Sequence, residues 1–391
     1  MNFNDWFLQL QTRAALNRGA GLPAFKALLL RLGNPHEKYQ IIHVAGTNGK
    51  GTVCTLLAHA LSLAGKKTGL FISPHLISPT ERIQINGAEI GPEDFMRVVK
   101  KVLAQEKEPL NLFEILTAAA LVYFAEKKVH YAVLETGLGG RKDPTNVCMP
   151  VLAIITSVGL DHTHILGDSL EKIAAEKAGI IKSGVPVLCG YLPPAARRVV
   201  EHTARERNAP LQIVCAEKLP GRAQTQNKQL VYQAAKCVGI ADGILQHGLE
   251  KVNVPGRFEI FSCGNKTIIL DGAHNPQAIE NLLAFWQTTP FAQKRAAVLC
   301  AFMQDKDYSQ MLSMLSARFR VGIVTAISSP RAAGETLLAP LLPPGWEFVS
   351  NVSAALLRAQ EKADVILVTG SFYLAGEVRK HIIIPPGGNG R

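Results

Sequence analysis

A glycine-rich turn carrying a lysine and a threonine follows an apolar run near the N-terminus. Residues 41–45 are mostly apolar and lead into Gly46, and Lys50 and Thr52 come within the next six residues. Glycines let backbone N–H groups crowd round phosphate oxygens, and a lysine adds a point charge. A helix predicted from residue 53 adds the positive end of its dipole. The pattern predicts a phosphate-binding loop made of Thr47, Asn48, Gly49, Lys50, Gly51 and Thr52.

The spacing of this loop departs from the usual pattern G-x-x-x-x-G-K-[ST]. Gly46 lies two residues late, and Gly51 separates Lys50 from Thr52. A glycine-rich turn that binds no ligand is therefore the alternative. The order strand, turn and helix favours phosphate binding, because this order aims the helix N-terminus at the ligand.

Three polar residues follow strands predicted downstream of the loop. Ser73 follows the strand 68–72, Glu135 follows 131–134, and His162 lies six residues after 151–156. The carboxyl ends of parallel strands meet at one edge of a sheet, and magnesium prefers oxygen ligands. Glu135 is thus a candidate metal ligand. Alternatively, its carboxylate accepts from amides of the glycine turn that follows, and His162 is an ordinary hydrogen-bonding loop residue.

Three further residues offer ambiguous chemistry. Lys177 lies on a helix predicted to face the sheet, where it could bind phosphate or carry a carbamate. Its spacing alone favours a lysine whose stem is buried and whose charge reaches water. In the second half of the chain, Asp271 ends a strand and could bind a ribose hydroxyl or a lysine. Arg257 lies in a predicted linker and could reach a phosphate.

The elements that would position these residues alternate between strand and helix. This alternation predicts an α/β fold: a mainly parallel sheet carrying the P-loop, then a smaller Rossmann-like α/β domain. We place the domains at 1–255 and 256–391. Glycine and proline at 19–23 are expected to separate two N-terminal helices. The tail from residue 385 is rich in proline and glycine and predicts disorder.

Composition narrows the functional classes. No apolar run approaches the ~18–20 residues that span a bilayer. The seven cysteines are scattered without a C-x-x-C pair, which indicates reduced thiols in a cytosol rather than a disulfide framework or zinc site. The net charge of +11 suits anionic ligands, nucleic acid or simply a basic proteome. No long basic block is present in the sequence, which weakens the nucleic-acid interpretation.

Several separated segments together resemble the folylpolyglutamate synthase/dihydrofolate synthase family, relatives of the Mur ligases. The resemblance covers roughly residues 40–380. The segments that carry it are 44–52, 73–76, 81–83, 134–140, 143–146, 160–163, 176–181 and 271–276.

The resemblance implies roles for individual residues. Residues 47–50 would hold the phosphates of ATP, and one or two magnesium ions would bind at Ser73, Glu135 and His162. Lys177 matches a lysine that is carbamylated in relatives, where it helps to hold a second metal. The catalytic residues implied are Lys50, Lys177 and His162. The nucleotide-binding residues implied are Asn227, Arg257 and Asp271, and the substrate-binding residues are Leu112, Phe113, Glu114, Asp143 and His274.

Two departures from the family pattern stand out. The stretch between Cys215 and Leu219 is very short, where relatives usually place a further β-rich segment. The sequence Lys142-Asp143-Pro144 replaces the Leu-Asp-Ala that is common in bifunctional members. The aspartate is kept, which favours use of dihydropteroate.

The activity implied is ATP-dependent ligation of L-glutamate in folate biosynthesis. A carboxylate of dihydropteroate or of a folate would take the γ-phosphate of ATP, and the amine of glutamate would then displace phosphate. We expect a cytoplasmic monomer that binds small molecules and neither nucleic acid nor membrane. The alternatives are a Mur-type ligase acting on another carboxylate, a P-loop NTPase without folate activity and a nucleic-acid-binding protein.

Overall fold

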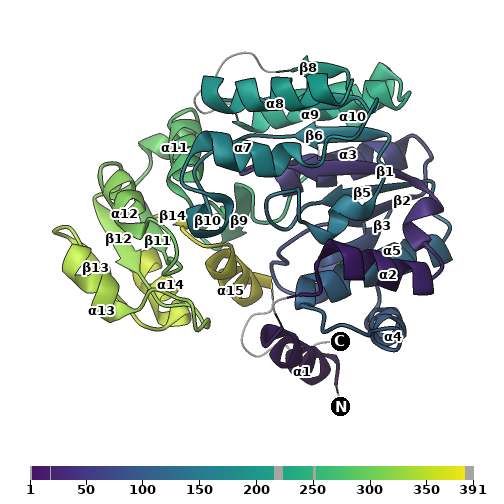
Figure 1. The fold of residues 1–391 in the computed structure, drawn as a ribbon. Coiled ribbons are helices and arrows are strands. Elements are labelled where there is room, and N and C mark those ends of the chain that lie inside the picture. Colours follow the sequence, from purple (N-terminus) through teal and green to yellow (C-terminus); the bar gives the residue numbers. More distant parts are fainter. Residues whose placement is uncertain (1, 18, 215–222, 250–251, 384–391) are drawn as a thin grey trace. The chain divides into compact units, whose positions relative to one another are not determined.

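The computed structural model describes residues 2–17, 19–214, 223–249 and 252–383 (Figure 1). The chain divides into two compact units. Unit 1 holds Met1–Glu217 and Gln226–Val252, and unit 2 holds Lys218–Thr225 and Asn253–Arg391. The domains expected at 1–255 and 256–391 remain a prediction.

Unit 1 is built on an eight-stranded sheet in its described part, in the order β4-β3-β2-β5-β1-β6-β7-β8. Its strands are β1 (Gln40–Ala45), β2 (Thr68–Phe71), β3 (Ile83–Ile85), β4 (Ala88–Glu89), β5 (Tyr131–Glu135), β6 (Leu152–Ile155), β7 (Val187–Cys189) and β8 (Leu211–Ile213). Its helices are α1 (Phe3–Ala15), α2 (Gly21–Arg31), α3 (Lys50–Leu63), α4 (Pro92–Leu103), α5 (Leu112–Glu126), α6 (Thr163–Leu166), α7 (Leu170–Ala178), α8 (Pro194–Glu206), α9 (Ala223–Cys237) and α10 (Asp242–Gly248), with short 3₁₀ turns η1 (Pro35–Glu37), η2 (Pro79–Arg82) and η3 (Pro144–Val147).

Strand β1 lies at the centre of this sheet, between β5 and β6, and pairs with both in parallel. Its residues from Ile41 to Ala45 are all buried, as expected of a parallel strand covered on both faces. Only β3 and β4 run antiparallel to their neighbours among the described strands of this sheet. The mainly parallel sheet predicted for this half of the chain is therefore confirmed.

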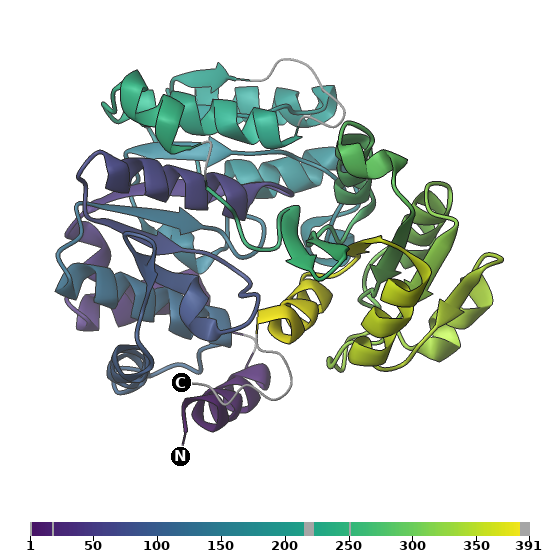
Figure 2. The same ribbon diagram turned by 180° about the vertical axis from the view of Figure 1, so that it is seen from behind.

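Helices cover both faces of the unit 1 sheet. The connection through α3 runs from β1 outward to β2, and the connection through α5 runs back from the β2 edge to β5. Right-handed crossovers in opposite directions place α3 and α5 on opposite faces (Figures 1 and 2). Helix α5 is buried on all sides from Glu114 to Phe124, which explains its nearly continuous apolar sequence.

Unit 2 carries a six-stranded sheet in its described part, in the order β13-β12-β11-β14-β10-β9, with only β9 antiparallel to its neighbour. Its strands are β9 (Glu259–Cys263), β10 (Lys266–Leu270), β11 (Ala296–Cys300), β12 (Val321–Val324), β13 (Trp346–Phe348) and β14 (Val365–Thr369). Its helices are α11 (Pro276–Gln287), α12 (Tyr308–Ser316), α13 (Glu335–Leu338), α14 (Val352–Lys362) and α15 (Phe372–Ile383), with η4 (Pro290–Gln293) and η5 (Ala339–Leu341).

One expectation about local structure is corrected. Gly21 and Pro23, expected between the two N-terminal helices, lie inside the first turn of α2. A proline is tolerated there because its missing N–H would have no partner in the helix. The predicted disordered tail and the short stretch between Cys215 and Leu219 lie outside the described residues.

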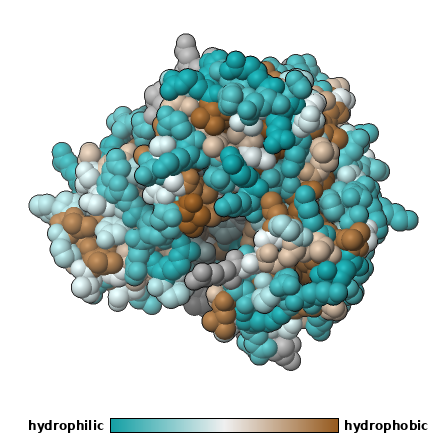
Figure 3. Space-filling model, viewed as in Figure 1, coloured by the Kyte–Doolittle hydropathy of each residue, from teal (hydrophilic) through white to brown (hydrophobic). Residues whose placement is uncertain are grey.

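No helix among the described residues has the combination of length and apolar character that crossing a membrane requires. Figure 3 shows apolar side chains in separate patches among hydrophilic ones on the face in view.

A glycine in β12 gives room to a tryptophan of the neighbouring strand. A Cβ on Gly322 would lie 2.1 Å from the indole ring of Trp346, whose Nε1–H donates to the Phe319 carbonyl at 3.2 Å. We expect Gly322→Ala to displace this ring and lower the free energy of unfolding by about 1–3 kcal/mol. A Cβ on Gly334 meets nothing within 4 Å, so Gly334→Ala is the control. Urea unfolding should separate the two variants, and equal midpoints would contradict the expectation.

Candidate active site

The predicted phosphate loop leaves the end of β1 and is held by hydroxyl groups that follow β6. The Thr47 hydroxyl donates to the Gly159 carbonyl and accepts from the Gly159 N–H. The Asn48 N–H donates to Ser157 Oγ at 3.0 Å, and Thr156 Oγ1 donates to the Asn48 carbonyl at 2.6 Å. The loop is thus fixed by bonds from the neighbouring strand end, which leaves little for a ligand to reorganise.

Two lysines converge on one carbonyl of this loop. The Lys50 Nζ donates to the Gly46 carbonyl at 3.0 Å, and the Lys177 Nζ donates to the same oxygen at 2.9 Å. Lys50 also donates to the Thr47 carbonyl at 3.3 Å. Lys177 reaches the loop from α7 with only 3% of its surface exposed. The structure therefore brings together two cationic residues that lie far apart in the sequence.

Burial and charge change the protonation of Lys177. Burial, together with the nearby Lys50 charge, lowers the pKa of Lys177 to about 7, although Asp161 and Asp143 oppose the shift. An amine with this pKa is largely neutral at pH values above 7. The expectation of a lysine with a solvated charge is therefore wrong for Lys177, because its ammonium is enclosed.

Neighbouring side chains lie close to the Cα atoms of two glycines of the loop, where a Cβ would otherwise stand. A Cβ on Gly46 would lie 1.9 Å from Thr156 Oγ1, so no larger residue fits there without moving the strand end. A Cβ on Gly49 would lie 2.7 Å from the amide oxygen of Asn227 on α9. Asn227 thus packs against the loop, at the position where the resemblance implies contact with ATP.

Ser73 and Glu135, two of the expected metal ligands, lie side by side. The Ser73 N–H donates to Glu135 Oε2 at 2.9 Å, and the Glu135 carboxylate is buried close to Gly51. The third, His162, lies on another loop, where its N–H donates to Asp161 Oδ1 at 2.8 Å. Within the described residues, no three His, Cys, Asp or Glu side chains gather to hold a metal.

This donor set suits magnesium better than a softer metal. A carboxylate and a hydroxyl are hard oxygen donors, and magnesium commonly binds one or two carboxylates together with substrate phosphates. The residues present therefore fit a magnesium ion whose remaining ligands would be phosphate oxygens of a substrate and water.

Asp143 lies at the end of a buried hydrogen-bond chain that starts on β1. The His43 Nε2 lies 2.7 Å from Thr145 Oγ1, which lies 2.5 Å from Asp143 Oδ1. Burial lowers the pKa of His43 to about 3, so its ring is neutral. Asp143 also accepts from the N–H groups of Leu138 and Thr145, and burial raises the pKa of this carboxyl. The carboxylate thus fixes the loop that follows β5.

The residues expected to bind substrate on α5 play different parts in the structure. The Glu114 carboxylate accepts from the N–H groups of Ala20, Gly21 and Asn111, so it caps α5 and holds the loop before α2. Phe113 is half-buried and packs against Phe71 and Gly137. Leu112 lies beside it at the edge of the core.

In unit 2, Asp271 and His274 lie on the turn after β10. The Asp271 carboxylate accepts from the N–H groups of Phe258 and Ala273. Burial raises the pKa of Asp271, while Arg257 opposes the shift. The His274 Nδ1–H donates to the Gly272 carbonyl at 2.8 Å, which fixes the ring. The side chain of Arg257 lies over the ring of Phe372.

Thr156, Ser157 and Gly159, which support the phosphate loop, were not singled out from the sequence. A signal was present, because two hydroxyl residues follow directly after a buried strand. Glu81 was also overlooked as a support. Its carboxylate accepts from three successive N–H groups, at 76–78, and so fixes the loop that begins at Ser73.

Comparison with known proteins finds matches over most of the chain. Residues 44–260 match the family model "Mur ligase middle domain", and residues 256–372 match "Mur ligase, glutamate ligase domain". The dihydrofolate synthase/folylpolyglutamate synthase of Bacillus subtilis is 35% identical, over 93% of this chain and 95% of that protein. The protein of the same name from Escherichia coli is 31% identical, over 97% of this chain and 95% of its own.

Solved structures give the same result. A structure of E. coli FolC in complex with DHPP and ADP has a TM-score of 0.89 at 30% identity and covers 98% of both chains. A bifunctional folylpolyglutamate synthase/dihydrofolate synthase from Yersinia pestis, complexed with AMPPNP and Mn ion, has the same values. The chain therefore belongs to the Mur ligase family and, within it, to the folylpolyglutamate synthase/dihydrofolate synthase group.

Proposed function

We propose that this chain is an ATP-dependent ligase that joins L-glutamate to dihydropteroate, to the γ-carboxyl of a reduced folate, or to both. The observation that carries the proposal is the convergence of Lys50 and Lys177 on the Gly46 carbonyl, with the Glu135 carboxylate nearby. Such a site suits a triphosphate with its metal. The substrates are inferred from the names of the relatives.

The reaction would take place in two steps. A carboxylate oxygen of the acceptor attacks the γ-phosphorus of ATP, the bond to the β-phosphate oxygen breaks, and an acyl phosphate and ADP form. The glutamate amine then attacks the acyl carbon, phosphate leaves, and the nitrogen loses a proton. The Lys50 ammonium would give up its hydrogen bonds to the loop carbonyls and bind the migrating phosphoryl group instead. Catalysis would then come from the positioning of the reactants and from this positive charge.

Ser73, Glu135 and His162 would hold magnesium, and a carbamate on Lys177 would help to hold a second ion. Bound metal offsets the negative charge of phosphate oxygens. Asn227, Arg257 and Asp271 would contact the nucleotide, as the resemblance implies. His274 would bind substrate, with its ring held by the hydrogen bond from Nδ1–H to the Gly272 carbonyl.

Phe113 and Leu112 would receive the flat ring of the acceptor. Asp143 and Glu114 would shape this part of the site through the amides that they bind. We also infer a cytoplasmic monomer. The six cysteines in the described residues are free, which suits a reducing compartment.

An acceptor-swap assay tests the function. Purified protein with magnesium, ATP and glutamate should release ADP when dihydropteroate or tetrahydrofolate is added, and little ADP without either. The ratio between the two acceptors decides which synthase activity the chain has. If neither compound increases the release of ADP, the assignment to folate substrates is wrong, and a ligase acting on another carboxylate is favoured.

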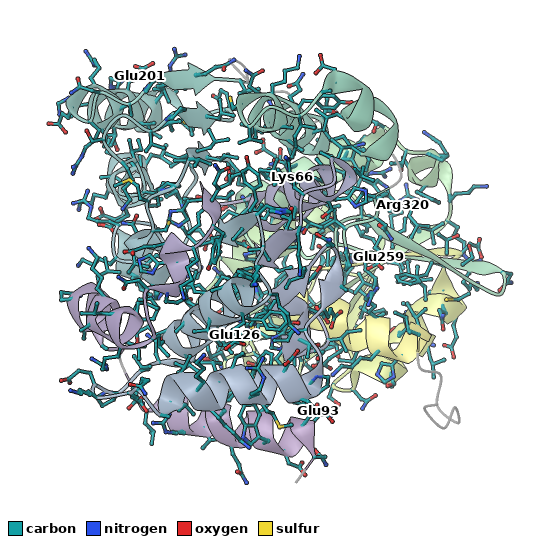
Figure 4. All side chains as sticks on the ribbon, turned by 90° about the vertical axis from the view of Figure 1, so that its right-hand side faces the viewer. Lys66, Glu93, Glu126, Glu201, Glu259 and Arg320 are labelled. Atoms are coloured by element: carbon teal, nitrogen blue, oxygen red, sulfur yellow. The ribbon has the colours of Figure 1, made fainter. Side chains whose placement is uncertain are left out.

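Replacement of Lys50 tests the phosphate loop. Lys50→Ala should lower kcat by about 100-fold or more, because a preorganised charge on the migrating phosphoryl group is lost. Lys66→Ala is the matched control. Lys66 is exposed just beyond the other end of α3 and is labelled in Figure 4. Near-normal turnover by a folded Lys50→Ala protein would remove Lys50 from the mechanism.

The pKa of about 7 for Lys177 predicts a dependence on pH and bicarbonate. A neutral amine adds to CO₂ with loss of a proton, whereas an ammonium cannot. The rate should therefore fall about tenfold per pH unit below 7 and decrease when bicarbonate is removed. Lys177→Arg should lose activity, because an arginine cannot carry the carbamate, and any residual rate should depend on neither pH nor bicarbonate in this way. In ¹³C NMR with labelled bicarbonate, the wild type should show a carbamate signal and Lys177→Arg should not.

Lys172→Arg, on the exposed face of the same helix, is the control for this experiment. If the rate does not depend on bicarbonate and no carbamate signal is seen at pH 8, Lys177 does not carry a carbamate. Activity retained by Lys177→Arg would lead to the same conclusion.

A further inference from the structure

The segment that leads into β9 forms a turn that presents Arg257. The Arg257 N–H donates to the Val254 carbonyl at 3.0 Å, and the Gly272 N–H donates to the Gly256 carbonyl at 2.9 Å. Both neighbours of Arg257 have left-handed backbone angles, with φ of 65° at Gly256 and 48° at Phe258. Glycine adopts this conformation readily, but at Phe258 it persists only where surrounding bonds impose it.

The guanidinium of Arg257 is available to a ligand. Its centre lies 5.0 Å from the centroid of the Phe372 ring, a cation–π arrangement. Within the described residues it makes no hydrogen bond or ion pair, although Asp271 is close enough to influence it electrostatically. An arginine held over a ring with its donors unused is well suited to a phosphate.

Carboxylates hold the amides on both sides of Arg257. The Gly256 N–H donates to Glu259 Oε2 at 2.9 Å, and the Phe258 N–H donates to Asp271 Oδ2 at 2.9 Å. Glu259, labelled in Figure 4, has only 4% of its side chain exposed. A charge buried to this degree needs a partner, since its desolvation is costly otherwise.

Arg379 is that partner. Its Nε lies 3.1 Å from both carboxylate oxygens of Glu259. Arg379 is seven residues after Phe372 on α15, so the two side chains share one face of the helix. Helix α15 therefore reaches Arg257 twice, through Phe372 under its guanidinium and through the Arg379–Glu259 pair at its backbone.

We propose that Arg379 is a positioning residue that sets nucleotide affinity through Glu259 and the backbone of Arg257. The inference rests on the proposed function for the role of Arg257. Without the Arg379 charge, Glu259 would turn toward water and release the Gly256 amide. The turn would then hold Arg257 less firmly. Nucleotide binding would have to order this side chain, and the free energy that the ordering costs would weaken the binding.

The test measures binding of a non-hydrolysable ATP analogue with magnesium by calorimetry, without acceptor or glutamate. Arg379→Gln should raise Kd about tenfold, as for the loss of one charge-assisted hydrogen bond. Arg379→Lys, which keeps the charge but lacks the Nε–H donor, should have a Kd between that of this variant and that of the wild type. Arg358→Gln on α14 is the control and should leave Kd unchanged, since the bonds of Arg358 to described residues are those to Glu347 and Glu361.

A double variant separates positioning from general damage. Because Arg379 acts through Arg257, Arg257→Ala combined with Arg379→Gln should bind no more weakly than Arg257→Ala alone. Losses that add, an unchanged Kd for Arg379→Gln, or normal binding by Arg257→Ala would each overturn the inference. If the wild type binds the analogue but shows no glutamate-dependent turnover, the proposed function fails while the positioning result stands.

Discussion

The Gly46 carbonyl is the acceptor on which the phosphate loop depends. A carbonyl oxygen has two lone pairs, and here Lys50 and Lys177 each donate to it. The loop that carries this oxygen leaves β1, while Lys50 begins α3 and Lys177 lies on α7. The two cations repel each other across it, and this repulsion adds to the effect of burial on Lys177. The pKa of Lys177 is therefore lowered by its burial and by the charge of Lys50, a residue far from it in the sequence.

Acidic side chains near the candidate site bind the chain's own amides. Glu114, Asp143 and Asp271 each accept from at least two backbone N–H groups. Glu81 accepts from three. A sequence motif shows that a carboxylate is present, and it cannot show whether the carboxylate faces a ligand or a loop. One donor to Glu135 is the Ser73 amide, which follows another strand and not the glycine turn after β5.

The fold could be predicted well because the central strands are continuous apolar runs and the helices begin at clear caps, as at Asn111 and Asn275. Strand β13 could not, since three residues show no periodicity. The phosphate loop and the proximity of Ser73 to Glu135 could also be predicted from the sequence, because the carboxyl ends of parallel strands meet at one edge of a sheet. The burial of Lys177 and the bonds of Thr156 to the loop depend on pairs far apart in sequence, which spacing does not encode.

Two cations proposed to contact the nucleotide, one in each unit, share one property. Lys50 in unit 1 donates to carbonyl oxygens, and Arg257 in unit 2 lies over an aromatic ring, so neither has an ion pair with a carboxylate within the described residues. Lys50 and Arg257 are partly buried, and a partly buried cation without a counterion is solvated less well than in water, a loss that a bound anion offsets. Because the nearby carboxylates are bound to amides, they do not compete for these cations. The arrangement thus favours an anionic ligand, and the amides that bind the acidic side chains contribute to that preference by keeping those carboxylates engaged.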